Sequence, residues 1–556
     1  MIQKMLYKNF NITVPKVPFR GFRGKRTKMK TLKLLILLIG LSFYSCKDDY
    51  NNHYDRSSDL PEKSLFELIK ADPDLSTFAR LIEIGAYKET LDTTQTYTVW
   101  APENSALPNI DLNTISEVQA RQIVGNHVAR FNNSTAIRDG KPVKMNNRKV
   151  YSFSEGGTLF GGVQINRRDI LAKNGLLHTI KNQIPFHYNF YEYIKAIPGV
   201  SKLRDFISQF DEEIFDMEAS YAYIDPKTNQ LMYDSVMVFY NRLFDFPLLG
   251  LGHIHSEDSI YTMLMPSDEA WDAAYARISP SFKVYPANDS ITKIQTSLAI
   301  VSDLIYRKLI NEPASQDSLI SSASSIIHNP AELFGGLTPE TASNGLIFPT
   351  DNLNYNNRDT WNKPIVVECE DPDARQPINA QTTAATEREV AAGSTTYSVS
   401  GLRYLEVYYT NPNSNPQVIF LIPNVLAGKY DIYVEFIPES IADKTLSNDS
   451  TKMQFILTYT NARGQATPSI AKGAGFVTSG TKKVRMKVFN AFDFPVSDYY
   501  DRIWLINLYS GINSITDMKA KTTLSLQTDV TQTEFNNSIY RRKFRVDRII
   551  FEPVAK

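Results

Sequence analysis

The chain of 556 residues has only two cysteines, Cys46 and Cys369, four tryptophans and seven histidines. Two cysteines exclude a fold held by several disulfides, so burial of apolar side chains must supply the stability. The sequence also lacks a Gly-x-Ser-x-Gly elbow, a phosphate-binding loop and a His-Glu-x-x-His helix. These absences remove the common sequence signatures of hydrolases, nucleotide-binding proteins and zinc proteases. We therefore expect no enzymatic activity.

Acidic residues are missing from the first 47 positions. Basic residues run to Lys33, and an apolar run of eleven residues, Leu34–Tyr44, follows. This run is about half of the ~20 residues that a membrane-spanning helix needs, so it predicts the hydrophobic part of a secretory signal. Met29 gives such a signal an ordinary length. We expect residues 1–28 to be an upstream extension and residues 1–45 to be absent from the mature protein.

Ser45 directly before Cys46 resembles the cleavage site of bacterial lipoproteins. The resemblance implies that Cys46 is acylated and that a lipid anchors the protein to the outer membrane. Lys47-Asp48-Asp49 is similar to the acidic signal that directs some lipoproteins to the cell surface. We expect a surface-exposed outer-membrane lipoprotein with residues 46–61 as lipidated cysteine and tether. The alternative is an ordinary cleaved signal peptide and a soluble product.

The mature chain is acidic, although the full sequence has 60 basic and 60 acidic residues. Ten of the basic residues precede Cys46, which leaves 50 against 60 and a net charge of about −10. Nucleic-acid binding needs concentrated positive charge, so we expect no nucleic-acid partner.

Three blocks of sequence occur twice in the same order. The pairs are Phe66–Ser76 with Tyr191–Ser201, Tyr97–Pro102 with Tyr261–Pro266, and Asn174–Leu176 with Asn344–Leu346. Such repetition predicts a duplicated domain. Pro73 and Pro102 are 29 positions apart, whereas Pro198 and Pro266 are 68 apart, so the second copy has 39 extra residues. We place this insertion within about residues 210–259, with a β-hairpin around Asp225–Asn229.

The first copy resembles a fasciclin domain. Tyr97–Ala106 is similar to the first fasciclin motif, His127 to the central histidine, and Asn174–Ile180 to the second motif. The match covers residues 62–186. Residues 187–360 are similar, but Phe348 replaces His178 and no clear match to His127 is present. The resemblance implies α+β folds in tandem, adhesion or protein interaction outside the cell, and no general catalytic apparatus.

Residues 361–556 contain β-rich runs at regular spacing, which predict an all-β, jelly-roll-like sandwich. Val367–Glu370, Ala427–Tyr430 and Val546–Ile549 are similar to parts of galactose-binding-like carbohydrate-binding modules. That resemblance implies a structural calcium held by Glu368, Glu370 and Asp547. The alternative is a solvated acidic strand end. No other cofactor is expected.

Aromatic and histidine clusters supply the remaining candidate sites. Two sets of tyrosines are candidate platforms for a sugar or a protein, with burial in a core as the alternative. They are Tyr404, Tyr408 and Tyr409 near the C-terminus, and Tyr221, Tyr223 and Tyr233 in the insertion. His253 and His255, near Glu257 and Asp258, are two imidazoles at strand spacing. They suit a transition metal, but without an identifiable third ligand a polar loop is the simpler interpretation.

Together these features predict a non-catalytic surface lipoprotein for adhesion or for binding of proteins or glycans. By analogy with similar lipoproteins, it would be an accessory of an outer-membrane glycan importer. The alternative is a glycan-active enzyme that carries a C-terminal carbohydrate-binding module.

Overall fold

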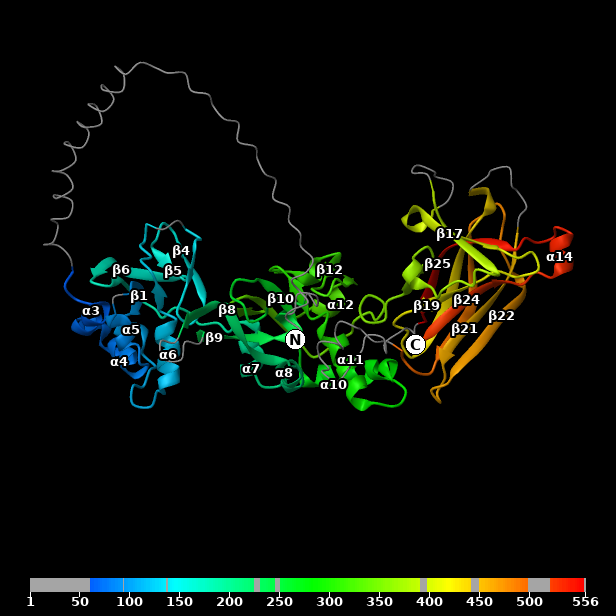
Figure 1. Ribbon diagram of the computed structural model, residues 1–556. Helices are drawn as coiled ribbons and strands as arrows, with labels where there is room; N and C mark the ends of the chain where they lie inside the picture. The colour runs from blue at the N-terminus through cyan, green and yellow to red at the C-terminus, as the bar shows by residue number, and fades with distance from the viewer. Residues whose placement is uncertain are drawn as a thin grey trace, which may run out of the picture. The chain divides into compact units, whose positions relative to one another are not determined.

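The computed structural model describes residues 61–93, 95–136, 139–224, 231–245, 251–390, 398–441, 450–498 and 521–554. Cys46, the leader and most of the tether lie outside this part. The chain divides into two compact units (Figure 1). The first contains the described residues up to Asn146 and Ser152–Ile184; the second contains Asn147–Tyr151 and the described residues from Pro185 onward. No helix within the described ranges is long and apolar enough to span a membrane.

The first unit begins with helices and continues with strands. The elements are α3 (Leu65–Ala71), α4 (Ser76–Ile84), α5 (Lys88–Asp92), β1 (Tyr97–Pro102), α6 (Glu117–Gly125), β2 (Val128–Arg130), β3 (Pro142–Lys144), β4 (Val150–Ser154), β5 (Leu159–Phe160), β6 (Val163–Ala172) and β7 (Gly175–Ile180). The strands form one sheet in the order β2-β1-β7-β6-β5-β4-β3. The mixed helix and strand class is therefore as predicted.

The helices of the first unit bury one apolar face each. Phe78, Leu81 and Ile82 on α4 are completely buried, as their i, i+3, i+4 spacing predicts. Ser64 begins α3 with a capping box, in which its hydroxyl accepts from the backbone N–H of Glu67 and the Glu67 carboxylate accepts from the backbone N–H of Ser64. These helices, together with β1 and β7, enclose a common core.

The second unit begins with a related arrangement. Its first elements are α7 (Phe190–Ala196), α8 (Ser201–Ser208), β8 (Asp211–Ile224), β9 (Leu231–Asn241), α9 (Arg242–Asp245), β10 (Tyr261–Pro266), α10 (Asp268–Ile278), α11 (Asp289–Val301), β11 (Ile305–Arg307), β12 (Ser318–Ile320), β13 (Ile326–His328), α12 (Ala331–Phe334), β14 (Glu340–Ala342) and β15 (Gly345–Thr350). The sheet order β11-β10-β15-β14 repeats the order β2-β1-β7-β6 of the first unit.

The repeated blocks occupy equivalent positions in the two sheets. β1 pairs with β7 in parallel, with Tyr97 opposite Gly175, and β10 pairs with β15 in parallel, with Tyr261 opposite Gly345. The asparagine before each glycine repeats the same role. Asn174 Oδ1 accepts from the N–H of the first residue of α3 at 2.9 Å, and Asn344 Oδ1 accepts from the N–H of the first residue of α7 at 3.0 Å. The duplication seen in the sequence is thus a duplication of backbone geometry.

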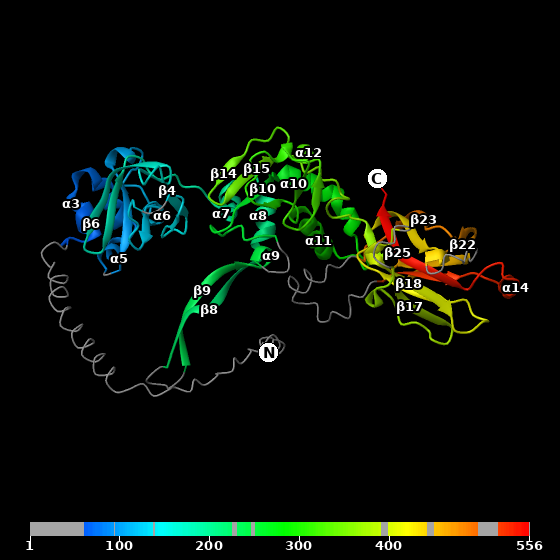
Figure 2. The same cartoon turned by 90° about the horizontal axis from the view of Figure 1, so that it is seen from above.

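The extra residues of the second repeat form a hairpin. β8 and β9 pair in antiparallel fashion from Asp211 opposite Asn241 to Ile224 opposite Leu231. Figure 2 shows the two strands extending away from α7 and α8. The predicted turn residues, 225–230, lie outside the described part. The hairpin occurs where the change in repeat spacing predicted an insertion.

The rest of the second unit is almost entirely β. Its strands and one helix are β16 (Ile365–Glu368), β17 (Thr383–Glu389), β18 (Arg403–Tyr409), β19 (Gln417–Ile422), β20 (Gly428–Ile437), β21 (Lys452–Thr460), β22 (Ala466–Val477), β23 (Val484–Phe494), β24 (Thr522–Thr528), α14 (Gln532–Asn536) and β25 (Lys543–Pro553). One sheet has the order β17-β18-β25-β20-β23, with β16 also on β25, and the other has the order β19-β24-β21-β22. The described strands agree with the β-rich pattern predicted for residues 361–556.

The two sheets pack against each other through aromatic side chains. The ring of Phe436 on β20 lies 6.2 Å from that of Phe455 on β21, and Tyr459 on β21 lies 6.0 Å from Phe494 on β23. One apolar core is continuous from Phe190 through these sheets. The domain boundary predicted at residue 361 therefore stays a prediction.

Candidate functional site

His127 has a structural position inside the first unit. Its Nδ1 donates to the carbonyl oxygen of Ile123 at 2.8 Å, and its Nε2 accepts from the backbone N–H of Ile184 at 3.1 Å. Complete burial lowers the pKa of His127 to about 4, so the ring is neutral at physiological pH. A neutral ring with both nitrogens bound to backbone groups joins α6 to the end of the unit.

His178 has the same kind of role on β7. Its Nδ1 accepts from the N–H of Asp169 at 3.1 Å, its Nε2 contacts the carbonyl oxygen of Asn133 at 3.1 Å, and burial lowers its pKa. In the second repeat, Phe348 occupies the equivalent strand position and Leu304 occupies that of His127. Apolar residues have replaced both histidines, so the second repeat keeps the framework without these two polar groups.

Of the three carboxylates predicted to hold calcium, Glu368 ends β16, Glu370 lies two residues further along the chain, and Asp547 lies inside β25. Asp547 is completely buried; its Oδ1 accepts from the N–H of Ser400 at 3.0 Å, and its Oδ2 accepts from Nζ of Lys483 at 2.7 Å. Glu368 Oε1 accepts from the Ser400 hydroxyl at 2.8 Å. The interpretation as a solvated strand end therefore does not fit Asp547.

The carboxylates of Glu368, Glu370 and Asp547 act on one another electrostatically, but within the described ranges their oxygens do not all come close enough to form one metal-ligand group. Within the described ranges, Oε2 of Glu368 and Oε2 of Glu370 are buried without a hydrogen-bond partner. Burial, together with the neighbouring carboxylates, raises the pKa of Glu370, and burial raises that of Asp547. Unpartnered buried carboxylate oxygens are costly, and a calcium ion takes such hard oxygen ligands. Calcium here would neutralise the cluster; its presence stays a prediction.

Cys369 lies between the two glutamates in the turn directly after β16. Its thiol is completely buried, and burial raises its pKa well above the ordinary value, reinforced by the nearby carboxylates. Its backbone N–H donates to the carbonyl oxygen of Asp547 at 3.0 Å. The residue therefore ties β16 to β25 and is not a nucleophile.

The C-terminal tyrosines do not form one platform. Alternation along β18 directs Tyr404 and Tyr408 to one face of the sheet and Tyr409 to the other. Tyr404 is only 4% exposed, and the ring of Tyr409 packs 5.3 Å from that of Phe535 on α14. A shared surface of all three rings is thus not formed, because the alternation of the strand separates them. Ligand binding by any one of them stays a prediction.

The hairpin tyrosines are placed only by their backbone. Tyr233 lies opposite Ala222, and Tyr221 and Tyr223 flank that position on β8. Their side chains lie outside the described part of the structure.

The two histidines at strand spacing converge on a third residue, Asp245. His253 Nδ1 lies 2.8 Å from Oδ1 of Asp245, and His255 Nε2 lies 2.9 Å from both of its carboxylate oxygens. Glu257 and Asp258, the acidic residues next to the histidines in the sequence, do not join this cluster. Sequence reasoning missed Asp245 because no local motif links the end of α9 to the histidines.

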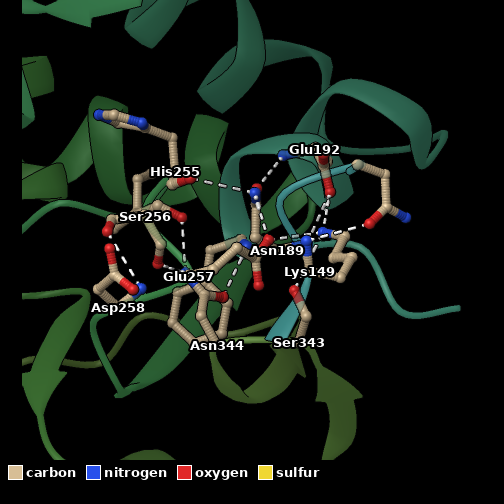
Figure 3. A network of polar contacts seen from close by, with 12 residues as sticks. Lys149, Asn189, Glu192, His255, Ser256, Glu257, Asp258, Ser343 and Asn344 are labelled. Carbon is tan, nitrogen blue, oxygen red and sulfur yellow. Dashed lines mark hydrogen bonds and ion pairs between the residues drawn. The ribbon is translucent and has the colours of Figure 1, made fainter. Parts of the chain in front are cut away.

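Glu257 belongs instead to a buried ion cluster around Lys149 (Figure 3). The Lys149 side chain is 1% exposed, and its Nζ lies 2.7 Å from Oε1 of Glu257 and 2.5 Å from Oε2 of Glu192. It also donates to the hydroxyl of Ser343 at 3.1 Å. Nothing in the local sequence around Lys149 predicts its burial.

This cluster lies behind the histidine loop. Asn189 donates to the carbonyl oxygen of His255 at 3.2 Å and to Oε1 of Glu257 at 3.1 Å. Asn344 donates to the carbonyl oxygens of Ile254 and Ser256 at 2.8 and 3.2 Å. Figure 3 shows the His255 ring pointing away from Lys149. The loop backbone is therefore fixed from one side while its imidazoles face the other.

The framework of β1, β7 and the two buried histidines is similar to a known family. Residues 73–184 match the fasciclin domain family. This match lies within the first repeat, residues 62–186. No curated protein matches the chain.

Several solved structures are similar to parts of the chain. One is a FAS1 domain pair from the insect cell adhesion molecule fasciclin I, with 14% identity over 51% of this chain and 98% of that one, at a TM-score of 0.19. Another contains the CBM22-1 and GH10 modules of Clostridium thermocellum xylanase 10B, with 11% identity over 34% of this chain and 27% of that one (TM-score 0.20). A third is Paenibacillus xanthan lyase, with 17% identity over 38% of this chain and 16% of that one (TM-score 0.20).

The fasciclin domain has a groove with a basic rim. Its volume is about 890 Å³, and its floor includes the buried side chains of Tyr97, Val143 and Met145. Four exposed cations line it: Arg121, Arg130, Lys141 and Lys144. The ring of Phe131, which is 71% exposed, also lines the groove. An apolar floor with cations around it suits a ligand that combines a flat apolar face with acidic groups.

Proposed function

We propose that this protein is a surface lipoprotein that binds extracellular partners without transforming them. The observation that carries the proposal is the fasciclin domain at residues 73–184. Its histidines are buried and bound to backbone groups, which suits a scaffold and not an acid or base. Adhesion through a rigid module needs exposed surface and no reactive group.

The second repeat is proposed to be another fasciclin-like domain. Two observations support this: β10 and β15 repeat the register of β1 and β7, and Asn344 repeats the contacts of Asn174. The two antiparallel sheets after residue 361 are proposed to form a galactose-binding-like sandwich, supported by the aromatic packing of the sheet that contains β20 against the sheet that contains β21. The whole would then present three binding modules in series.

Acidic polysaccharide is the ligand that we propose for the groove of the fasciclin domain. Arg121, Arg130, Lys141 and Lys144 supply cations at its rim, and the exposed Phe131 ring offers a face on which a sugar can stack. The mature chain is acidic as a whole and therefore repels an anionic ligand over most of its surface. The local positive charge of the groove attracts such a ligand to this one place.

A retention assay on immobilised polysaccharides tests this function. Beads carrying acidic and neutral glycans are incubated with the mature protein, and bound protein and released sugar are both measured. The double variant Arg130→Glu, Lys144→Glu should lose at least about tenfold in retention on acidic beads, because two rim cations become anions. Arg168→Glu, Lys173→Glu makes the same change in net charge on exposed residues outside the groove and should bind normally.

Three results would contradict or redirect the proposal. Release of sugar fragments would support the alternative, a glycan-active enzyme with a carbohydrate-binding module. Equal retention of both double variants would remove the groove as the binding surface. Binding to acidic peptides but to no glycan would redirect the proposal to protein partners.

Lipid anchoring at Cys46 and display on the outer membrane are part of the same proposal. The apolar run Leu34–Tyr44 and Ser45 before Cys46 support it. Labelled palmitate should enter the wild-type protein and not Cys46→Ala. Co-purification with an outer-membrane importer from detergent extracts tests the accessory role, whereas recovery without such a partner would favour adhesion.

A further inference from the structure

The cluster of His253, His255 and Asp245 belongs to the second repeat and shares no residue with the groove proposed to bind polysaccharide. It lies between the hairpin insertion and β10. The three ligand atoms, one from each side chain, all lie within 4.8 Å of one another. The cluster offers two imidazole nitrogens and one carboxylate oxygen. Zinc commonly binds both kinds of ligand atom in proteins.

Local backbone geometry directs both imidazoles to the same side. Ile254 is completely buried, whereas the side chains of His253 and His255 are 57% and 27% exposed and both reach Asp245. The N–H of His253 donates to the hydroxyl of Tyr261 at 3.0 Å. Gly252 has a φ of +98°, and a Cβ there would lie 2.9 Å from the Tyr261 ring, so the close approach of the loop to Tyr261 requires glycine. The positions of the two histidines are therefore built into the fold.

Asp245 is held in place from its own side. Its side chain is 6% exposed, and its Oδ2 accepts from the backbone N–H of Asn241 at 2.7 Å. The Asn241 amide therefore orients the Asp245 carboxylate, while its Oδ1 contacts both imidazoles, as a metal ligand requires.

The distances also suit insertion of a metal. Two ligands at about 2.1 Å from a tetrahedral zinc lie about 3.4 Å apart. The present separations of 2.8–2.9 Å must widen by about half an ångström. The His253 side chain is 57% exposed and His255 is 27% exposed, so both rings have room to move. The exposed side of the cluster leaves a coordination position for water or a ligand.

A second histidine and aspartate pair in the same unit provides a comparison. His328 Nδ1 lies 3.0 Å from Oδ1 of Asp359, with the His328 side chain 68% exposed. No group of three or more histidine, cysteine, aspartate or glutamate ligands other than Asp245, His253 and His255 is found within the described ranges. The pair of His328 and Asp359 therefore has the same kind of hydrogen bond but no third metal ligand beside it.

We propose that Asp245, His253 and His255 bind one divalent transition metal, with zinc as the best fit. The site has three protein ligands and one open position. That is the pattern of zinc sites that keep an exchangeable ligand, in contrast to closed structural sites with four protein ligands. The metal would connect the end of the hairpin, through α9, to the loop before β10.

Metal binding to the purified mature protein tests this proposal. Zn²⁺ is titrated in competition with a chromophoric chelator, and Co²⁺ is titrated as a spectroscopic probe of the ligand set. We expect one Zn²⁺ per chain and visible Co²⁺ absorption typical of tetrahedral coordination by nitrogen and oxygen. His255→Ala and Asp245→Asn should weaken Zn²⁺ binding by at least about tenfold. His328→Ala is the matched control and should bind as the wild type does.

Each outcome is decisive. Absence of stoichiometric Zn²⁺ and Co²⁺ binding in the wild type, or equal affinity in His255→Ala and His328→Ala, overturns the proposal. Should the buried Asp245→Asn variant fail to fold by circular dichroism, His253→Ala replaces it, since its side chain is largely exposed. Zn²⁺ should also raise the melting temperature of the wild type and of His328→Ala, and not that of His253→Ala. Failure of the polysaccharide assay leaves this result unaffected.

Discussion

The carbonyl oxygen of Tyr261 lies 1.9 Å from the position that a Cβ on Gly345 would occupy. In the fasciclin domain, the carbonyl oxygen of Tyr97 lies 1.8 Å from the equivalent position on Gly175. Both glycines have φ near +150°, a conformation that residues with side chains rarely adopt. The close contact at the start of each parallel strand pair is therefore a shared requirement of the two repeats.

Gly345→Ala should destabilise the second repeat by at least about 2 kcal/mol, because the new methyl group meets backbone atoms that have no room to move. The melting temperature of the second unit, measured by calorimetry, checks this. Gly475→Ala is the control, since a Cβ at Gly475 has no atom within 4 Å. A Gly345→Ala variant as stable as the control would show that the strands can separate without cost.

Lys149→Met should destabilise the second unit by about 3–5 kcal/mol, the usual cost of removing one partner from a buried ion pair. The change leaves Glu257, whose side chain is 5% exposed, without its cation. Urea unfolding of the variant and of Lys141→Met, an exposed lysine, gives the comparison. The double variant Lys149→Met, Glu257→Gln should recover part of the loss, and an absence of recovery would argue against the charge as the cause.

His127 should make the fasciclin domain less stable as the pH falls from about 6.5 to about 4. The pKa of His127 is about 4 in the folded state and has its ordinary value of 6.5 in the unfolded state. As the pH falls, the unfolded state is protonated before the folded state, and this protonation stabilises the unfolded state. The loss reaches about 3 kcal/mol at the lower limit. Pulse proteolysis in urea at several pH values measures it for the wild type and for His127→Gln, whose stability should change less over this range. Parallel curves would mean that other groups cause the acid sensitivity.

Calcium should raise the melting temperature of the C-terminal sheets, more at pH 7.5 than at pH 5. Because the pKa values of Glu370 and Asp547 are raised in the folded state, their ionisation without a cation destabilises the fold as the pH rises. A bound Ca²⁺ offsets this repulsion. Glu370→Gln should remove the calcium effect, while Glu389→Gln, an exposed carboxylate change, should keep it. A calcium response retained in Glu370→Gln would place the ion elsewhere.

Features that depend on a few neighbouring residues were predictable. The tight turn at Asn174-Gly175, the helix face of Phe78, Leu81 and Ile82, and the extra hairpin all follow from local pattern and spacing. The mixed α and β class is confirmed. Strands such as β22 were missed because their side chains are mostly partly or fully exposed and lack a continuous apolar run.

Features that depend on residues far apart in the sequence could not be predicted. Lys149 is the clearest case, because it is buried against Glu192 and Glu257, which lie 43 and 108 positions away. Asp245 is only eight positions before His253, but no known motif spacing links the two. The tyrosines of β18 differ, because the alternation of side chains along a strand is enough to separate Tyr409 from Tyr404. The calcium trio came from resemblance alone and stays a prediction.

The burial of Cys369 gives the protein a built-in reporter of unfolding. If Cys46 carries the proposed lipid, Cys369 is the remaining thiol of the chain. Because the Cys369 side chain has no access to solvent, thiol-alkylating reagents do not reach it in the folded protein. Maleimide labelling would then register only those events in which β16 separates from β25.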